Sequence, residues 1–145
     1  MFLALLFRCT TAPAPPEVVV VTEPAPRPPS TPTPLLAEAL DDPETAPDAL
    51  DELVRRGASE ELEAVALTSA DLGARGWAIT GLVQLDDADA LPTLQHDPTN
   101  PELVRIWAAA GRIQLADRNE LEDLRPLTRT WPELTRPFEK REAQL

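Results

Sequence analysis

Two stretches of the chain repeat one another at an offset of 30 residues. Residues 74–94 read ARGWAITGLVQLDDADALPTL, and residues 104–124 read VRIWAAAGRIQLADRNELEDL. Nine of these 21 positions are identical, and they include Trp77 and Trp107, although the chain has only three tryptophans. Repeats with periods of about 20–50 residues are supersecondary units that bury their apolar faces against one another. The repeat therefore predicts a stack of similar units rather than an unrelated globular topology.

A weaker copy of the repeat lies 29 residues upstream. Ala49 and Leu53 correspond there to Ala78 and Leu82, but the arginine and the tryptophan are missing. A divergent terminal unit is expected, because it must present a polar outer face. The sequence thus predicts three units and a cap, near residues 43–68, 71–96, 101–128 and 129–145.

Each unit has the pattern of two helices. In the third unit, Asn100 suits an N-cap and Pro101 the first helical position, so the first helix extends to about Leu115. Apolar residues recur along it at helical spacing on two faces, which indicates burial on two sides. A turn at 117–119 precedes leucines at 121, 124 and 127 that mark the second helix.

The other units follow the same plan. The second unit has predicted helices near 72–85 and 88–96. In the first unit, Asp42 and Pro43 open one helix and Ser59 caps the next. Thr33-Pro34 predicts a further short helix in front, and the prolines near residues 132 and 137 predict short capping helices behind. The expected fold class is all-α.

The third unit resembles the HEAT-like repeat, in particular the short variant associated with phycobilisome lyases. The matching positions are Val104, Arg105, Ala108, Ala109, Ala110, Leu115, Asp117, Leu121 and Leu124. The tryptophans at 77 and 107 depart from it, because small residues are usual there. The resemblance implies a short α-solenoid of the HEAT or armadillo kind, with about three helix pairs. It also implies a scaffold or protein-binding role, or alternatively an accessory role in cofactor attachment of the lyase type.

Several repeated residues have predicted structural roles. We expect Arg75 and Arg105 to pair with acids of the adjoining turns, such as Asp87 and Asp117.

The repeated aromatic and glycine positions concern packing. Trp77 and Trp107 are expected in the core, with an exposed aromatic ladder that anchors a partner as the alternative. Gly81 and Gly111 would each cost about 1 kcal/mol inside a helix relative to alanine. Close approach of a second helix is the expected compensation.

The charge of the chain points to a protein partner with a basic surface. Thirteen basic and 25 acidic residues give a net charge of −12, and the charges of residues 1–34 cancel. This balance argues against binding to nucleic acid phosphates, and so against a HEAT-like DNA-repair role. Acids gather on the second helices, which line the concave surface in HEAT-like solenoids. The expected partner-binding residues are Glu60, Glu63, Asp89, Thr93, His96, Glu120 and Asp123. A merely solvated face is the alternative.

The sequence contains no recognisable catalytic or metal-binding motif. One cysteine and one histidine exclude a cysteine-rich zinc site. Asp86, Asp87 and Asp89 lack the glycine and the final glutamate of an EF-hand loop. We therefore expect a protein that is not an enzyme and that holds no cofactor.

The N-terminal 34 residues contain nine of the 17 prolines. Such a tract predicts a disordered, polyproline-like tether or, alternatively, a polyproline ligand for another domain. Before it, Cys9 follows a short apolar run and resembles a bacterial lipoprotein start, although Arg8 stands where a small residue is usual. A periplasmic, lipid-anchored or secreted protein and a cytoplasmic one both remain open, and membrane attachment would depend on lipidation of Cys9.

Overall fold

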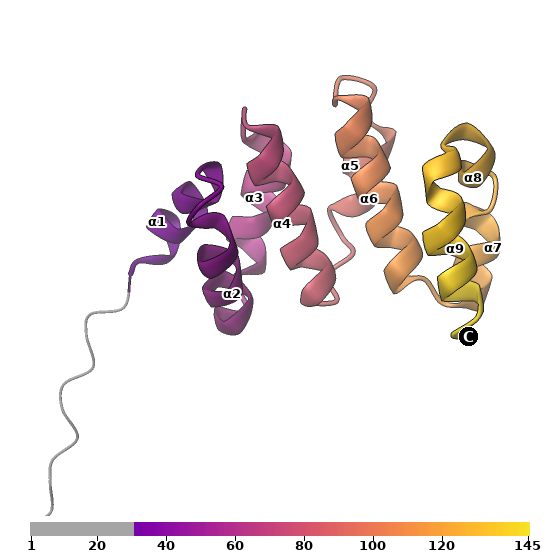
Figure 1. The fold of residues 1–145 in the computed structure, drawn as a ribbon, viewed down its shortest axis with the longest axis horizontal. Helices are drawn as coiled ribbons and strands as arrows, with labels where there is room; N and C mark the ends of the chain where they lie inside the picture. The colour runs from indigo at the N-terminus through magenta and orange to yellow at the C-terminus, as the bar shows by residue number, and fades with distance from the viewer. Residues whose placement is uncertain (1–30) are drawn as a thin grey trace, which may run out of the picture. The chain divides into compact units, whose positions relative to one another are not determined.

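The computed structural model describes residues 31–145, which form one compact unit beginning at Thr31. Within this unit the secondary structure is helical throughout, so the predicted all-α class is confirmed (Figure 1). No helix of residues 31–145 combines the length and the hydropathy that a transmembrane span requires. The signal-like segment, the proline-rich tether and Cys9 lie outside the described residues, except for the last few residues of the predicted tether.

The helices of residues 31–145 follow one another through short connections. In chain order they are α1 (Thr33–Glu38), α2 (Ala46–Arg56), α3 (Ser59–Thr68), α4 (Leu72–Gln84), α5 (Leu91–His96), α6 (Glu102–Leu115), α7 (Arg118–Leu124), α8 (Leu127–Thr130) and α9 (Thr135–Glu142). Two 3-10 turns, η1 (Ala39–Asp41) and η2 (Pro132–Leu134), precede α2 and α9 respectively.

Two sets of helices alternate along residues 31–145. Helices α2, α4, α6 and α9, here called the A helices, contact one another in that order, and α4 and α6 run side by side in Figure 1. Helices α3, α5 and α7 are here called the B helices. Helix α3 contacts α4, α5 contacts α6, and α7 contacts α9, so each B helix packs against the next A helix along the chain. The segment expected to form only a cap therefore supplies a further A helix.

Local chemistry explains where the helices depart from the predicted bounds. Helix α5 begins at Leu91 rather than near 88, because Pro92 fits only the first turn of a helix. Helix α2 begins at Ala46 rather than at 43, and Pro47 occupies its first turn in the same way. The front helix expected at Thr33-Pro34 forms as α1.

Two predicted N-caps are wrong. Ser59 is the first residue of α3, and its hydroxyl donates to the Asp87 carboxylate instead of capping the N-terminus of the helix. Asn100 is followed by Pro101, which occupies the N-cap position of α6. The Asn100 side chain accepts a 2.6 Å hydrogen bond from Arg75 Nη2 and donates one of 3.0 Å to the carbonyl of Leu94. Both side chains therefore link different units.

Glycines on two A helices are in close contact with the preceding B helix. A Cβ atom at Gly81 would lie 2.8 Å from Leu62 Cδ1, and one at Gly111 would lie 3.1 Å from Leu91 Cδ1. Leu62 and Leu91 are fully buried. The close approach expected from the sequence is thus present. It involves the preceding B helix and also the preceding A helix, since Leu50 Cδ1 would lie 2.8 Å from a Cβ at Gly81 and Val83 Cγ2 would lie 2.9 Å from one at Gly111.

The pairs of Arg75 with Asp87 and of Arg105 with Asp117 do not form. Arg75 Nε donates to the carbonyl of Ala66 at 2.7 Å, and Arg105 Nε donates to the carbonyl of Gln95 at 3.1 Å. Both carbonyls lie in the last turn of a B helix, where backbone oxygens lack a partner in their own helix and the helix dipole favours a cation. Burial lowers the pKa of Arg75, and the charge of Asp97 opposes that effect.

The two aspartates have other roles. Asp117 Oδ1 accepts the backbone N–H of Glu120 at 2.9 Å and so caps α7. Asp87 accepts from the Ser59 hydroxyl and, at 3.2 Å, from the backbone N–H of Asp89. Both carboxylates therefore accept hydrogen bonds near the start of a B helix, and Asp87 also links that helix to α3 through Ser59.

Glu52 lies between two arginines on α2. Arg55 donates to its two oxygens at 2.7 and 2.5 Å, and Arg56 Nε donates at 2.6 Å. The hydrogen bonds from Arg55, followed by those from Arg56, lower the pKa of Glu52 from 4.5 to about 2. Arg56 also donates to the carbonyl of Thr31 at 2.6 Å, so the cluster holds the chain before α1 against α2.

We predict that Gly111→Ala destabilises the protein by up to about 2 kcal/mol. The new methyl group would meet Val83 Cγ2 at 2.9 Å as well as Leu91, and overpacking typically costs about 1–3 kcal/mol. The gain in helix propensity, about 1 kcal/mol, offsets only part of that cost. Urea unfolding measures the change, with the exposed Gln114→Ala on the same helix as the control. A stabilised Gly111→Ala variant would contradict the prediction.

We also predict that Glu52→Gln flattens the loss of stability in acid. Folding lowers the pKa of Glu52, so its contribution is complete above about pH 4.5 and disappears as the pH falls toward 2. The melting temperature of the parent should therefore fall more steeply over this interval than that of the variant. Arg55→Gln, which removes the first of the two partners, should flatten the curve in the same direction. Parallel curves for parent and Glu52→Gln would rule out this linkage.

Candidate functional site

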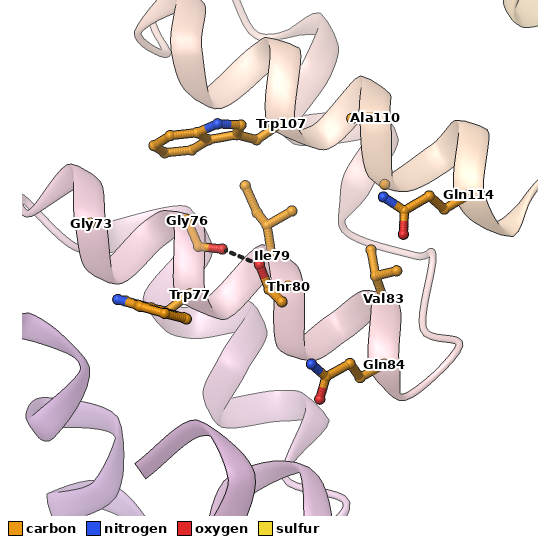
Figure 2. A pocket seen from close by; sticks show the side chains of 11 residues that line it. Gly73, Gly76, Trp77, Ile79, Thr80, Val83, Gln84, Trp107, Ala110 and Gln114 are labelled. Carbon is orange, nitrogen blue, oxygen red and sulfur yellow. Dashed lines mark hydrogen bonds between the residues drawn. The ribbon is translucent and has the colours of Figure 1, made fainter. Parts of the chain in front are cut away.

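An open groove of about 550 Å³ separates the two adjacent A helices α4 and α6. We call it the tryptophan groove. Its lining comprises Gly73, Gly76, Trp77, Ile79, Thr80, Val83, Gln84, Trp107, Ala110, Gly111 and Gln114. Figure 2 shows the two indoles toward one end of the groove, Gln84 and Gln114 toward the other, and Ile79 between them. The volume is typical of a binding site.

Trp77 and Trp107 are half-buried, which differs from the core position expected from the sequence. Each packs one side against the core. The Trp107 ring covers Gly76 on α4, where a Cβ atom would lie 3.0 Å from Cζ3 of the indole. A larger residue than glycine at this position would displace the ring. The absence of a side chain at Gly76 therefore sets how Trp107 lies across the groove.

Hydrogen-bond donors line the groove without partners of their own. Within residues 31–145, neither the Trp77 nor the Trp107 indole N–H donates to another group, and both are accessible. Gln84 and Gln114 are exposed. The Thr80 hydroxyl, in contrast, donates to the carbonyl of Gly76 at 2.9 Å (Figure 2). The groove thus combines an apolar floor with amide and indole donors.

A second open pocket, of about 450 Å³, continues from Gln114 toward α9. We call it the basic pocket, and it is lined by Gln114, Arg136, Pro137, Lys140, Arg141 and Gln144. Arg141 donates from Nε and Nη2 to the carbonyl of Ala116, at 3.0 and 2.9 Å. Arg136 and Lys140 are exposed, and neither forms an ion pair within residues 31–145. Their charge is therefore available at this end of the tryptophan groove.

The predicted partner-binding residues lie on or before the B helices. Glu63 is half-buried, and the others are exposed: Glu60, Asp89, Thr93, His96, Glu120 and Asp123. We call these seven residues the acidic surface.

The structure does not gather the acidic surface around one cavity. Asp89 shares an open pocket of about 540 Å³ with Asp86, Asp87 and Ser59, whereas Glu120 Oε1 lies 3.7 Å from Arg112 Nη2. His96 Nδ1 is 2.8 Å from the carbonyl of Pro92 in its own helix. Among residues 31–145, no group of acids, histidine and cysteine has the arrangement of a metal site.

The sequence contained a signal for the tryptophan groove. Trp77 and Trp107 recur with the repeat, and glycines stand at 73 and 76 beside the first of them. Large aromatic residues on a buried helix usually indicate core packing. The spacing of α4 and α6, which leaves one side of each ring open, depends on contacts between units and cannot be obtained from one helix alone.

We predict that the three tryptophans differ in their contribution to stability. Trp131 is 5% exposed, and its indole donates to Glu102 at 3.2 Å beneath the Arg105 guanidinium. Trp131→Ala should cost about 3–5 kcal/mol, as for a core aromatic. Trp77→Ala and Trp107→Ala should each cost about 1–2 kcal/mol, because only part of each ring is removed from water. Urea unfolding of the three variants tests this order, and equal losses would place all three in the core.

Comparison with known proteins gives no relative for this chain. No protein-family model, no curated protein and no solved structure matches it. The resemblance to HEAT-like repeats therefore stays a prediction, and the function has to be inferred from the chemistry of the surfaces described above.

Proposed function

We propose that the protein is a non-catalytic binding module whose ligand is another protein. The observation that carries the proposal is the tryptophan groove, because two half-exposed indoles stand there on adjacent helices. Tryptophan is strongly enriched among the residues that dominate the energy of protein interfaces. The lining contains no acid, base or thiol, so it favours recognition over proton transfer or nucleophilic chemistry.

The helix arrangement supports a short α-solenoid of the HEAT-like type as the scaffold. Each unit contacts its neighbours through equivalent positions, as the glycine–leucine contacts and the arginine–carbonyl bonds illustrate. Repeat proteins of this kind present surfaces built by several units at once. The tryptophan groove fits that principle, because its two walls come from equivalent helices of successive units.

A second candidate is binding of a basic protein to the acidic surface. It is favoured by the exposure of Glu60, Asp89 and Glu120, which come from three successive units. Exposed acids would speed the encounter with a cationic partner in a salt-dependent way. The tryptophan groove remains the better candidate, because it offers apolar area and directed donors in addition to an accessible cavity.

A matched pair of substitutions tests which surface binds. Thr80 lies in the tryptophan groove and Thr93 on the acidic surface, and both are exposed threonines within helices. Thr80→Arg should obstruct the groove, whereas Thr93→Arg adds the same side chain elsewhere. Exposed substitutions of this kind usually change stability by about 0.5 kcal/mol or less. Circular dichroism and thermal melts confirm that each variant folds.

The tagged chain and both variants are used as baits with a lysate of the source cells. We expect at least one protein to be enriched by the parent and by Thr93→Arg but at least tenfold less by Thr80→Arg. Glu60→Lys combined with Asp89→Lys and Glu120→Lys should retain it. If the enriched protein is lost with Thr93→Arg and with the triple variant but is kept with Thr80→Arg, the acidic surface and not the tryptophan groove is the binding site.

A further inference from the structure

The tryptophan groove and the basic pocket share a lining residue. Gln114, near the end of α6, lines both of them. The tryptophan end is apolar and uncharged, and the far end presents Arg136 and Lys140 without a carboxylate in the lining. Two other pockets of residues 31–145, near α1 and before α5, instead have carboxylates in their linings. A ligand that fits both ends needs an apolar part and a negative charge.

The donors of the groove identify the backbone of the ligand. The exposed amides of Gln84 and Gln114 can donate to backbone carbonyls of a ligand. A helical ligand has most of its carbonyls bonded within its own helix, so it would offer these amides few acceptors. A polyproline II segment has no internal hydrogen bonds and presents its carbonyls outward. Its rigid prolines also suit aromatic-lined grooves at a low entropic cost.

The basic pocket identifies the charge of the ligand. Arg136 and Lys140 are exposed cations with no ion pair among the described residues. A carboxylate from the ligand would lie between these two cations with little desolvation. Ion pairs of this exposed kind increase the specificity and the rate of association more than the affinity. The ligand therefore carries an aspartate or a glutamate beyond its prolines.

The spacing along α6 sets the length of the motif. Trp107 and Gln114 are seven residues apart, which corresponds to about 10 Å along a helix at about 1.5 Å per residue. A polyproline II chain covers that distance in roughly three to four residues at about 3.1 Å each. Gln114 also lines the basic pocket, so the carboxylate follows the first docked proline by at least about four residues.

We propose that the surface binds a proline-rich segment of a partner protein in the polyproline II conformation, with its prolines on Trp77 and Trp107 and its carboxylate at Arg136 and Lys140. The proposal rests on the proposed function, because it names the ligand of the same groove. The synthetic peptide APAPPE, which repeats the sequence of residues 12–17, has the required chemistry and serves as the probe. Acetylated and amidated ends leave the glutamate as its only charge.

Nuclear magnetic resonance of the full chain supplies a readout with an internal control. The three indole N–H signals can be assigned with Trp→Phe variants. Titration with the peptide should move the signals of Trp77 and Trp107 and leave that of Trp131 in place, because the last is buried and bonded to Glu102. A peptide AAAAAE should move none of them. If APAPPE moves neither groove signal at millimolar concentration, the proposal is wrong.

The charge requirement has its own control. APAPPQ should bind at least threefold more weakly than APAPPE, and Lys140→Gln in the protein should reduce that difference. Lys140 is the only lysine of the chain, so carbodiimide coupling of APAPPE should give an amide that mass spectrometry locates there. Equal affinity for the two peptides, or coupling confined to the terminal amine, would overturn the assignment of the basic pocket.

Two further outcomes are informative. One distinguishes a wrong ligand from a wrong binding surface, and the other distinguishes a partner's segment from residues 12–17 of this chain. If Thr80→Arg loses a protein from the lysate while APAPPE does not bind, the groove is a binding surface for a different ligand and the polyproline assignment fails. Replacing Pro13, Pro15 and Pro16 with alanine in the chain should leave the affinity for APAPPE unchanged. A tenfold gain in affinity would show that residues 12–17 themselves compete for the groove, and would overturn the assignment to a partner.

Discussion

The contact between a glycine of one A helix and a leucine of the preceding B helix determines the packing of the units. Gly81 and Gly111 have no side chain, so Leu62 and Leu91 come close to the backbones of α4 and α6. Each glycine weakens its helix by about 1 kcal/mol relative to alanine, and burial of a leucine side chain offsets that cost. The arginines at 75 and 105 add a second periodic link, because they bind carbonyls that end the same B helices.

The spacing of α4 and α6 leaves room for the tryptophan groove. Glycine occurs on α4 again at 76, where the Trp107 ring crosses the helix. Because the ring lies over a backbone rather than between side chains, one part of it packs against the core and another part faces the groove. Helix packing therefore places large aromatic surface where a ligand can reach it.

Acidic and basic side chains lie on different parts of the surface, which the net charge of the chain does not reveal. Most acids of the B helices are exposed, whereas the tryptophan groove is uncharged and the basic pocket adjoins it. Several acids outside these pockets bind arginines within one helix, as Glu52 and Glu122 do, and those hydrogen bonds lower the pKa of each carboxyl. Acids that are held locally contribute less to a common binding surface than their number implies.

The sequence by itself determined the all-helical class and most helix bounds, because apolar periodicity and proline positions act within one helix. It also indicated the close approach at Gly81 and Gly111. It did not determine the partners of Arg75 and Arg105, the role of Ser59, or the open side of Trp77 and Trp107. These features depend on which units lie against each other and at what distance. A repeat shows that two residues are equivalent, but only tertiary packing decides whether an equivalent side chain meets a carbonyl, a carboxylate or water.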